Sequence, residues 1–241
     1  MNYHQQLQIA GYSEFRRIPL PNDGVIMLTS ALAEEGKTFI TTQLAIAKAL
    51  KLGTNKPVLF LDLNTFKQRG SELLLGEGHP SITKGLVDVL KDRATIQECI
   101  LPTGFRQLFV LPFGNADADF IPLEHLQKLD QIILNDLKNY QVIIDSCPLF
   151  LRNRRNFDPV ELAQIADYTF LVILSGKTPR EIILRCKKDI EGVGRELNGV
   201  IMNDQFVKPF RSELAVYASR LEKISLFKKP VGYMRARLGI Y

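Results

Sequence analysis

Three consecutive residues, Gly36, Lys37 and Thr38, have the side chains and the spacing of a phosphate-binding loop. They follow an apolar segment, Val25–Leu28, and precede a helical pattern that continues to Leu50. A strand that stops just before a helix N-terminus directs backbone N–H groups at an anion. In such a loop the lysine neutralises the β- and γ-phosphates, and the threonine hydroxyl is a ligand of Mg²⁺. These residues predict a nucleotide site.

The loop departs from the usual pattern at its first position. Ala31 stands five residues before Gly36, where these loops normally have a glycine. A solvated turn between a strand and a helix, with Thr38 near the N-cap, explains the motif alone equally well. By itself, the loop therefore leaves both interpretations open.

Two carboxylates at the ends of other apolar segments favour the nucleotide site. Val58–Leu61 is followed by Asp62, and Val142–Ile144 is followed by Asp145. The carboxyl ends of parallel strands form the ligand crevice of an open α/β sheet, so both acids can reach a magnesium ion on a bound triphosphate. Either aspartate alone is more simply explained as a turn residue that caps the next helix. The order of the three motifs together favours nucleotide binding.

Apolar and amphipathic segments alternate along the chain, which predicts an α/β fold with a doubly wound, mostly parallel sheet. The fold is Rossmann-like, with helices on both faces in three layers, and its short apolar strands should be buried on both sides. The expected strands are Val25–Thr29, Val58–Leu61, Leu108–Leu111, Val142–Ile144, Thr169–Leu174 and Val200–Met202. The expected helices are Phe39–Leu50, Leu123–Leu137, Pro159–Ala166 and Pro179–Val193. We expect Gly70–Pro80 to be a polar connection.

The composition is ordinary for a folded protein with a sizeable core. The chain has 241 residues, 46% of them hydrophobic and 24% charged. No apolar run approaches the roughly 20 residues of a membrane-spanning helix, and the N-terminus lacks the apolar stretch of an export signal. We therefore expect a cytoplasmic protein.

The cysteine and histidine patterns argue against two other kinds of site. Cys99, Cys147 and Cys186 are dispersed and lack Cys-x-x-Cys spacing, so they suggest neither a disulfide framework nor a zinc site. The three histidines have no partners at ligand spacing. We assign no transition metal.

The motifs together resemble a branch of the P-loop ATPases that includes the bacterial tyrosine kinases of capsule and exopolysaccharide assembly. Chromosome-partitioning and septum-positioning ATPases are more distantly similar. The resemblance covers residues 25–204, most of the chain. The segments that carry it, in chain order, are Leu61–Asn64, Gly85–Leu90, Leu111–Gly114, Asp145–Pro148 and Gly199–Asn203.

This resemblance implies ATP and Mg²⁺ as cofactors and gives each candidate residue a role. Lys37, Asp62 and Asp145 are the expected catalytic residues, and Thr38, Asp62 and Asp145 the expected metal ligands. Asn203 stands where an asparagine of this superfamily contacts adenine. The expected nucleotide contacts are Ala33, Glu34, Glu35, Gly36, Lys37, Thr38, Phe39 and Asn203.

Several departures from the family pattern bear on activity. Asn64 replaces the second acid of the kinase motif, and its amide can coordinate magnesium but is a poor proton acceptor. Leu32 stands where partitioning ATPases have a signature lysine, which favours the kinases. The family's arginine-containing oligomerisation motif is half visible in Glu14–Arg17, with Leu20 in place of its second arginine, so a homo-oligomer is an open alternative. The C-terminal tyrosines are reduced to Tyr217, Tyr233 and Tyr241.

Three parts are expected: a polar lead-in at residues 1–23, a P-loop ATPase or kinase-like domain at 24–205, and a basic helix and tail at 206–241. The last part contains eight basic and two acidic residues, a net charge of +6, whereas the whole chain carries +5. This charge suits an anionic phospholipid surface or an acidic protein, with nucleic acid the least favoured partner, and it equally suits a solvated terminus. Ser212–Phe227 has amphipathic spacing, for docking on the sheet or lying on a membrane.

Two functions remain open. The first is a cytoplasmic tyrosine autokinase that regulates exopolysaccharide or capsule polymerisation and export, activated by the cytoplasmic segment of a membrane co-polymerase at the inner face of the cell membrane. The second is an ATP-dependent switch, related to the partitioning and septum-positioning ATPases or to a degenerate kinase, that controls association with a membrane or protein partner. The family resemblance favours the first pathway. Asn64 and the sparse tyrosines favour the activity of the second.

Overall fold

The computed structural model describes residue 15 and residues 18–51, 56–65, 68–116, 120–151 and 155–204. The chain divides into two units, Met1–Asn203 and Asp204–Tyr241, and the fold described below is that of the first. The expected helix Ser212–Phe227, the C-terminal tyrosines and most of the arginine motif lie outside the described residues. The proposed domain boundaries therefore stay predictions.

A seven-stranded sheet forms the centre of the first unit, in the order β3-β4-β2-β5-β1-β6-β7. Every neighbouring pair is parallel except β3 and β4, which confirms the predicted mostly parallel sheet. The strands are β1 Val25–Ser30, β2 Val58–Asp62, β3 Leu101–Pro102, β4 Leu108–Leu111, β5 Gln141–Asp145, β6 Tyr168–Leu174 and β7 Leu197–Asn203.

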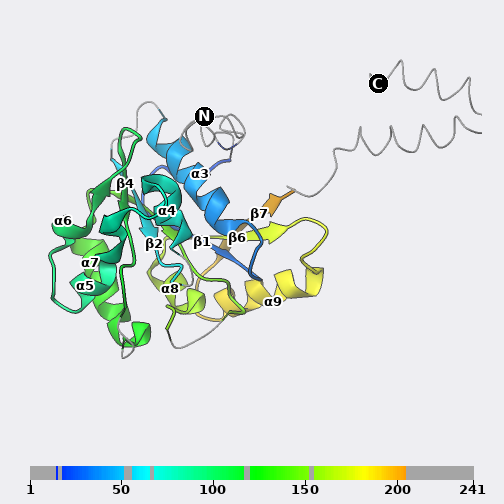
Figure 1. The fold of residues 1–241 in the computed structure, drawn as a ribbon. Helices are drawn as coiled ribbons and strands as arrows, with labels where there is room; N and C mark the ends of the chain where they lie inside the picture. The colour runs from blue at the N-terminus through cyan, green and yellow to red at the C-terminus, as the bar shows by residue number, and fades with distance from the viewer. Residues whose placement is uncertain are drawn as a thin grey trace, which may run out of the picture. The chain divides into compact units, whose positions relative to one another are not determined.

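Helices cover both faces of this sheet (Figure 1). One core cluster joins residues of α3 and α4 to one face, and the other joins residues of α5 to α9 to the opposite face. The helices are α3 Lys37–Ala49, α4 Arg69–Leu75, α5 Leu86–Leu90, α6 Ile96–Cys99, α7 Leu126–Asn135, α8 Pro159–Ile165 and α9 Arg180–Glu191, with 3₁₀ turns η1 Pro80–Thr83 and η2 Pro122–His125. Among the described helices, none is both long and apolar enough to cross a membrane.

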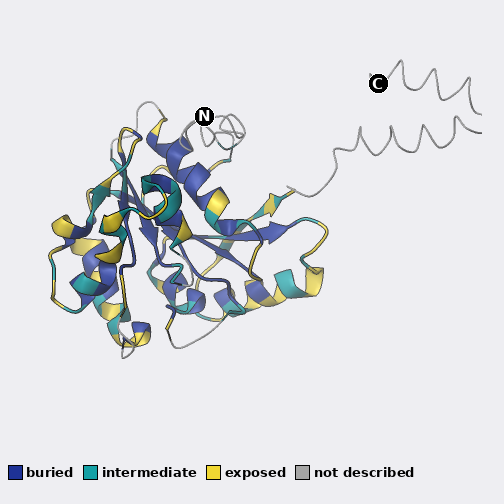
Figure 2. Cartoon of the chain, in the orientation of Figure 1, coloured by how far each residue is buried: buried dark blue, intermediate teal, exposed yellow. Residues whose placement is uncertain are grey.

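The central strands are buried on both sides, as the apolar segments predict, but β7 is not. All of β2 and β5 is buried, whereas Val200 and Met202 of β7 are 46% and 63% exposed. The prediction of two buried faces is therefore wrong for β7. This strand lies at the sheet edge, where alternate side chains meet solvent among the described residues (Figure 2).

The expected connection at Gly70–Pro80 is also wrong in part, because it contains most of α4 and begins η1. A Cβ at Gly70 would lie 2.5 Å from the ring of Phe60, so this glycine allows α4 to pack closely on β2. Leu74 is fully buried on the same helix. Tertiary packing thus outweighs the weak helix propensity of glycine.

The other expected helices form with changed ends. The segment Leu123–Leu137 divides into η2 and α7, and α3 begins at Lys37 rather than Phe39. The earlier start of α3 places Lys37 and Thr38 in its first turn, directly after the loop.

Candidate nucleotide-binding site

The loop between β1 and α3 has the backbone of an anion site. Gly36 is the N-cap of α3 and adopts φ 81°, a left-handed conformation. A Cβ at this position would lie 2.2 Å from Asn203 Nδ2, so the close approach also requires glycine. Gly36 offers no side-chain cap, which leaves the N–H groups of the first turn of a 13-residue helix available to an anion.

The loop lysine is paired with the acid at the end of β5. Lys37 Nζ lies 2.5 Å from Asp145 Oδ1, and their side chains are 4% and 0% exposed. Thr38 donates its hydroxyl to Asp145 Oδ2 at 2.8 Å, and Thr41 lies 3.4 Å from Oδ1. The structure therefore brings together a cation, a hydroxyl and a carboxylate. The last two supply the oxygen ligands that Mg²⁺ prefers.

Asp62 lies beside Asp145, because the two residues are register partners on β2 and β5. It is fully buried, and its Oδ2 accepts hydrogen bonds from the Ser71 N–H at 2.7 Å and the Ser71 hydroxyl at 2.8 Å. Burial, and then the charge of Asp145, raise the pKa of Asp62 from 3.8 to about 7, although Ser71 and Lys37 oppose the change. Asp62 is thus oriented by the first turns of α4, next to the cavity rather than in its wall.

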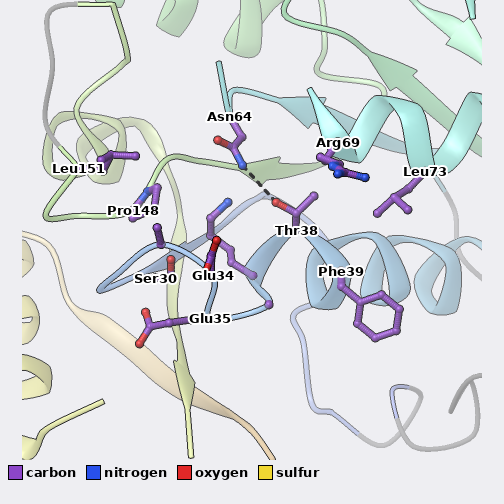
Figure 3. Close-up of a pocket in the computed structure, with 13 residues that line it drawn as sticks. Ser30, Glu34, Glu35, Thr38, Phe39, Asn64, Arg69, Leu73, Pro148 and Leu151 are labelled. Carbon is purple, nitrogen blue, oxygen red and sulfur yellow. Dashed lines mark hydrogen bonds between the residues drawn. The ribbon is translucent and has the colours of Figure 1, made fainter. Parts of the chain in front are cut away.

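Asn64 reaches the cavity where Asp62 does not. Its Nδ2 donates a hydrogen bond to Thr38 Oγ1 at 3.2 Å (Figure 3), and its backbone N–H donates to Asp62 Oδ1 at 3.3 Å. A neutral amide therefore lies against the hydroxyl that is the candidate metal ligand. It can offer a carbonyl oxygen to magnesium, but it adds no negative charge.

Lys37, Thr38 and Asn64 line a cavity of about 500 Å³, a volume in the range of small-molecule sites. The expected nucleotide contacts among its lining residues are Ala33, Glu34, Glu35, Gly36, Lys37, Thr38 and Phe39. The structure adds five residues that the sequence did not identify, namely Ser30, Arg69, Leu73, Pro148 and Leu151. Arg69, the first residue of α4, is labelled with the other lining residues in Figure 3. In the sequence, the one feature that could have identified Arg69 as a cavity residue is its basic side chain shortly after Asp62.

Glu35 and Asn203 connect the loop to neighbouring segments. Glu35 borders the cavity and is 3% exposed, but its carboxylate accepts hydrogen bonds from the Leu32 N–H at 2.7 Å and from the hydroxyl of Thr178. Asn203 Nδ2 donates to the Glu35 carbonyl oxygen at 2.9 Å, and Asn203 is outside the cavity wall. Both side chains thus hold the loop in place in this structure.

Among the described residues there is no cluster of three His, Cys, Asp or Glu side chains suited to a metal. Magnesium at a nucleotide site needs few protein ligands, since phosphates and waters complete its shell. Thr38 and Asp145 therefore fit Mg²⁺ carried in with a triphosphate better than a resident metal.

Comparison with known proteins relates this chain to others by sequence. No family model matches the chain. It is 26% identical over 195 residues to the tyrosine-protein kinase YwqD of Bacillus subtilis, covering 81% of this chain and 78% of that protein. It is 28% identical over 182 residues to the tyrosine-protein kinase CpsD of Streptococcus pneumoniae, covering 74% and 75%. Its relatives are bacterial tyrosine kinases.

Solved structures show that the similarity between this chain and the kinases includes the fold. The VpsO kinase domain superposes with a TM-score of 0.66 at 25% identity, over 82% of this chain and 92% of that one. MinD from Pyrococcus horikoshii shares the fold with a TM-score of 0.60 at 22% identity, over 79% and 75% of the two chains. The first unit therefore has the P-loop fold common to the bacterial tyrosine kinases and the MinD-like ATPases.

Proposed function

We propose that this chain binds Mg-ATP and transfers its γ-phosphoryl group to a tyrosine hydroxyl. One observation carries the proposal: Lys37 and Thr38 contact Asp145. They do so at the N-terminus of α3, directly after the loop, where the backbone can hold an anion. The likeness to tyrosine kinases on about three quarters or more of this chain supports the acceptor. Phosphoryl transfer depends mainly on positioning and charge neutralisation, which these groups can supply.

Each residue of the site has a proposed task. The N–H groups from Ala33 to Phe39 and the Lys37 ammonium hold the phosphates, and Thr38, Asp145 and the neighbouring Asp62 serve Mg²⁺. Bound magnesium would neutralise charge on the transferred phosphoryl group. Asp62 also orients the nucleophile and accepts its proton, a role suited to a carboxyl with a pKa raised toward neutrality. Asn203 selects adenine after its amide turns from the Glu35 carbonyl.

We further propose a cytoplasmic protein that acts at the inner face of the membrane with the cytoplasmic segment of a polysaccharide co-polymerase. Its pathway would be exopolysaccharide or capsule production. The support is the family resemblance and the basic segment at 206–241, which suits an anionic surface. A homo-oligomer is a further part of this proposal.

A second candidate function is an ATP-dependent switch with little kinase activity. One observation favours it: neutral Asn64 lines the cavity where the kinase motif has its second acid. A switch needs nucleotide binding and slow turnover, but it does not need efficient deprotonation of a tyrosine.

Calorimetric titration with Mg-ATP tests the nucleotide site. Lys37→Met should abolish binding, because it removes the charge that contacts the phosphates. Lys187→Met is the matched control, since Lys187 is exposed on α9. Thermal unfolding of each variant shows whether it remains folded. If folded Lys37→Met binds Mg-ATP with unchanged affinity, the assignment of this loop as a P-loop is wrong.

Mass spectrometry after incubation with Mg-ATP separates the two functions. Phosphotyrosine on the wild type, reduced roughly 10²-fold in Asp62→Asn as expected for loss of a general base, supports the kinase. Tight Mg-ATP binding without any phosphotyrosine supports the switch.

A further inference from the structure

Two neighbouring glutamates of the loop line the nucleotide cavity in different surroundings. Glu34 is exposed, and its backbone has φ 65°. Glu35 also lines the cavity, but only 3% of its surface is exposed. The proposed function places several phosphate charges against this loop, and like charges brought together in a partly buried site repel one another strongly. The Glu35 carboxylate therefore needs a fixed position that keeps it away from the phosphates.

Each oxygen of the Glu35 carboxylate has its own donor. Oε2 accepts a hydrogen bond from the Leu32 N–H at 2.7 Å, and Oε1 accepts one from the Thr178 hydroxyl. Leu32 belongs to the loop itself, so its contact moves with the loop. Thr178 lies 143 residues further along the chain than Glu35. Its hydroxyl is therefore the donor that fixes this carboxylate from outside the loop.

The turn between β6 and α9 orients the Thr178 hydroxyl. The backbone N–H of Thr178 donates to the Leu174 carbonyl at 3.0 Å, and its Oγ1 accepts a hydrogen bond from the Leu174 N–H at 3.0 Å. The Leu174 carbonyl oxygen, 3.2 Å from Oγ1, is a second acceptor within reach of the hydroxyl proton. An ionised carboxylate is a stronger acceptor than a carbonyl. The turn thus presents one well-placed donor to Glu35.

The backbone of Glu35 is held from the neighbouring strand. Asn203 Nδ2 donates to the Glu35 carbonyl oxygen at 2.9 Å, and Asn203 on β7 is the register partner of Leu174 on β6. Two adjacent strand ends therefore hold Glu35, one by its backbone and the other by its side chain. In the proposed function, the Asn203 amide leaves this contact when it turns to adenine. The Thr178 hydroxyl then supplies the remaining hydrogen bond to Glu35 from outside the loop, among the residues that the structure describes.

We propose that Thr178 is a positioning residue for the nucleotide site, whose hydroxyl keeps the Glu35 carboxylate in its buried position, away from the bound phosphates. This role rests on the nucleotide binding proposed above, and it belongs to a residue that lies outside the cavity wall. Without the hydroxyl, the carboxylate retains the Leu32 N–H as its donor. A single contact within the loop leaves the carboxylate free to turn toward the cavity that Glu35 lines. Repulsion of the phosphates would then weaken nucleotide binding.

Calorimetric titration of the full chain with Mg-ATP tests this role. Thr178→Val keeps the size of the side chain but removes the donor, and it should weaken Mg-ATP binding roughly tenfold, the scale of a hydrogen bond to a charged group. Thr178→Ser retains the hydroxyl and should bind Mg-ATP as the wild type does. Thermal unfolding shows whether each variant is folded at the temperature of the titration. If Thr178→Val is not folded there, Thr178→Cys takes its place, because a thiol is only a weak donor.

A double-mutant cycle with Glu35 separates positioning of the carboxylate from a purely structural role of Thr178. In a Glu35→Gln background, Thr178→Val should weaken Mg-ATP binding by less than about twofold, because no carboxylate remains to repel the phosphates. Glu34→Gln is the matched control background, in which the tenfold loss should persist, since Glu35 and Thr178 are both intact.

Two results would overturn the proposal while leaving the nucleotide function in place. The first is an equal loss of affinity from Thr178→Val in the wild-type and Glu35→Gln backgrounds, which would show that Thr178 acts only on the fold. The second is an unchanged affinity of folded Thr178→Val for Mg-ATP. If the wild type itself does not bind Mg-ATP, the nucleotide function is wrong, and the role of Thr178 is wrong with it.

Discussion

The ends of β5 and β2 carry the two aspartates of the site in contrasting surroundings. Asp145 of β5 lies 2.5 Å from the Lys37 ammonium and also accepts the hydroxyl of Thr38. Asp62 of β2 is its register partner, but Ser71 supplies its closest donors, and its pKa is raised. Two identical side chains on neighbouring strands therefore have different partners: Asp145 contacts a cation, whereas Asp62 accepts hydrogen bonds from neutral donors.

This difference separates two parts of the chemistry. In the proposed function, the β5 end and the loop bind phosphate and magnesium. The β2 end holds the group that would take a proton, and next to it stands Asn64, a neutral amide. In the proposed function, nucleotide binding therefore depends on the β5 end, and phosphoryl transfer depends on Asp62.

The largest effect should follow removal of the β5 acid. Asp145→Ala leaves the buried Lys37 ammonium without its counter-ion, which should reduce the free energy of unfolding by about 3–5 kcal/mol. Urea denaturation measures it. Lys187→Ala, which removes an exposed pair with Glu191 at 3.5 Å, should cost only about 0–1 kcal/mol. Similar losses in the two variants would show that the Lys37–Asp145 contact is not a special feature of the site.

Asp62 should make the free energy of unfolding depend on pH. Because its pKa is raised from 3.8 to about 7 in the folded protein, the folded state holds a proton that the unfolded state releases in this interval. The stability from this group is present below about pH 4 and is lost as the pH rises through about 7. Asp62→Asn should flatten the curve there. Urea titrations across this pH range measure the change, with exposed Asp136→Asn as control, and an unchanged slope in Asp62→Asn would contradict the assignment.

The sheet and half of the site follow from local sequence patterns. Short apolar segments that end in aspartate predict β2 and β5, and in a parallel sheet their carboxyl ends must share one edge. The Gly36–Thr38 loop is likewise a local motif, in which Gly36 is the residue that needs the left-handed backbone conformation. Neither prediction needs a knowledge of distant contacts, which is why the Lys37, Thr38 and Asp145 cluster was accessible from sequence.

The other half depends on tertiary packing that local patterns do not reveal. Gly70 looks like part of a connection, yet its lack of a side chain lets α4 pack on Phe60 and bring Ser71 to Asp62. Glu35 was expected to contact the nucleotide, and it does border the cavity, but Thr178, far along the chain, binds its carboxylate. The edge exposure of β7 also depends on what covers it, not on its own apolar sequence.

Asn64→Asp tests the difference between the ends of β2 and β5, because it adds a negative charge to the β2 end. The new carboxylate would lie beside Thr38 and strengthen magnesium binding. We expect phosphoryl transfer about tenfold faster, equivalent to about 1.4 kcal/mol in the barrier. Initial rates of ADP release at saturating Mg-ATP measure this. Asn64→Leu, which has no coordinating oxygen, should be slower than wild type, and the hypothesis fails if both substitutions act alike.

The smallest effect should come from Arg69, which brings a positive charge to the β2 side of the cavity. It is exposed, so solvent weakens its attraction for phosphate, and Arg69→Ala should weaken Mg-ATP binding by only about threefold, within the range of exposed charge pairs. Arg69→Lys keeps the charge and should bind like wild type. Screening at about 1 M salt, where the Debye length is near 3 Å, should remove the difference between Arg69→Ala and wild type in calorimetry. A loss that persists at high salt would instead place Arg69 in direct contact with the phosphates, and the β2 end would then share in nucleotide binding.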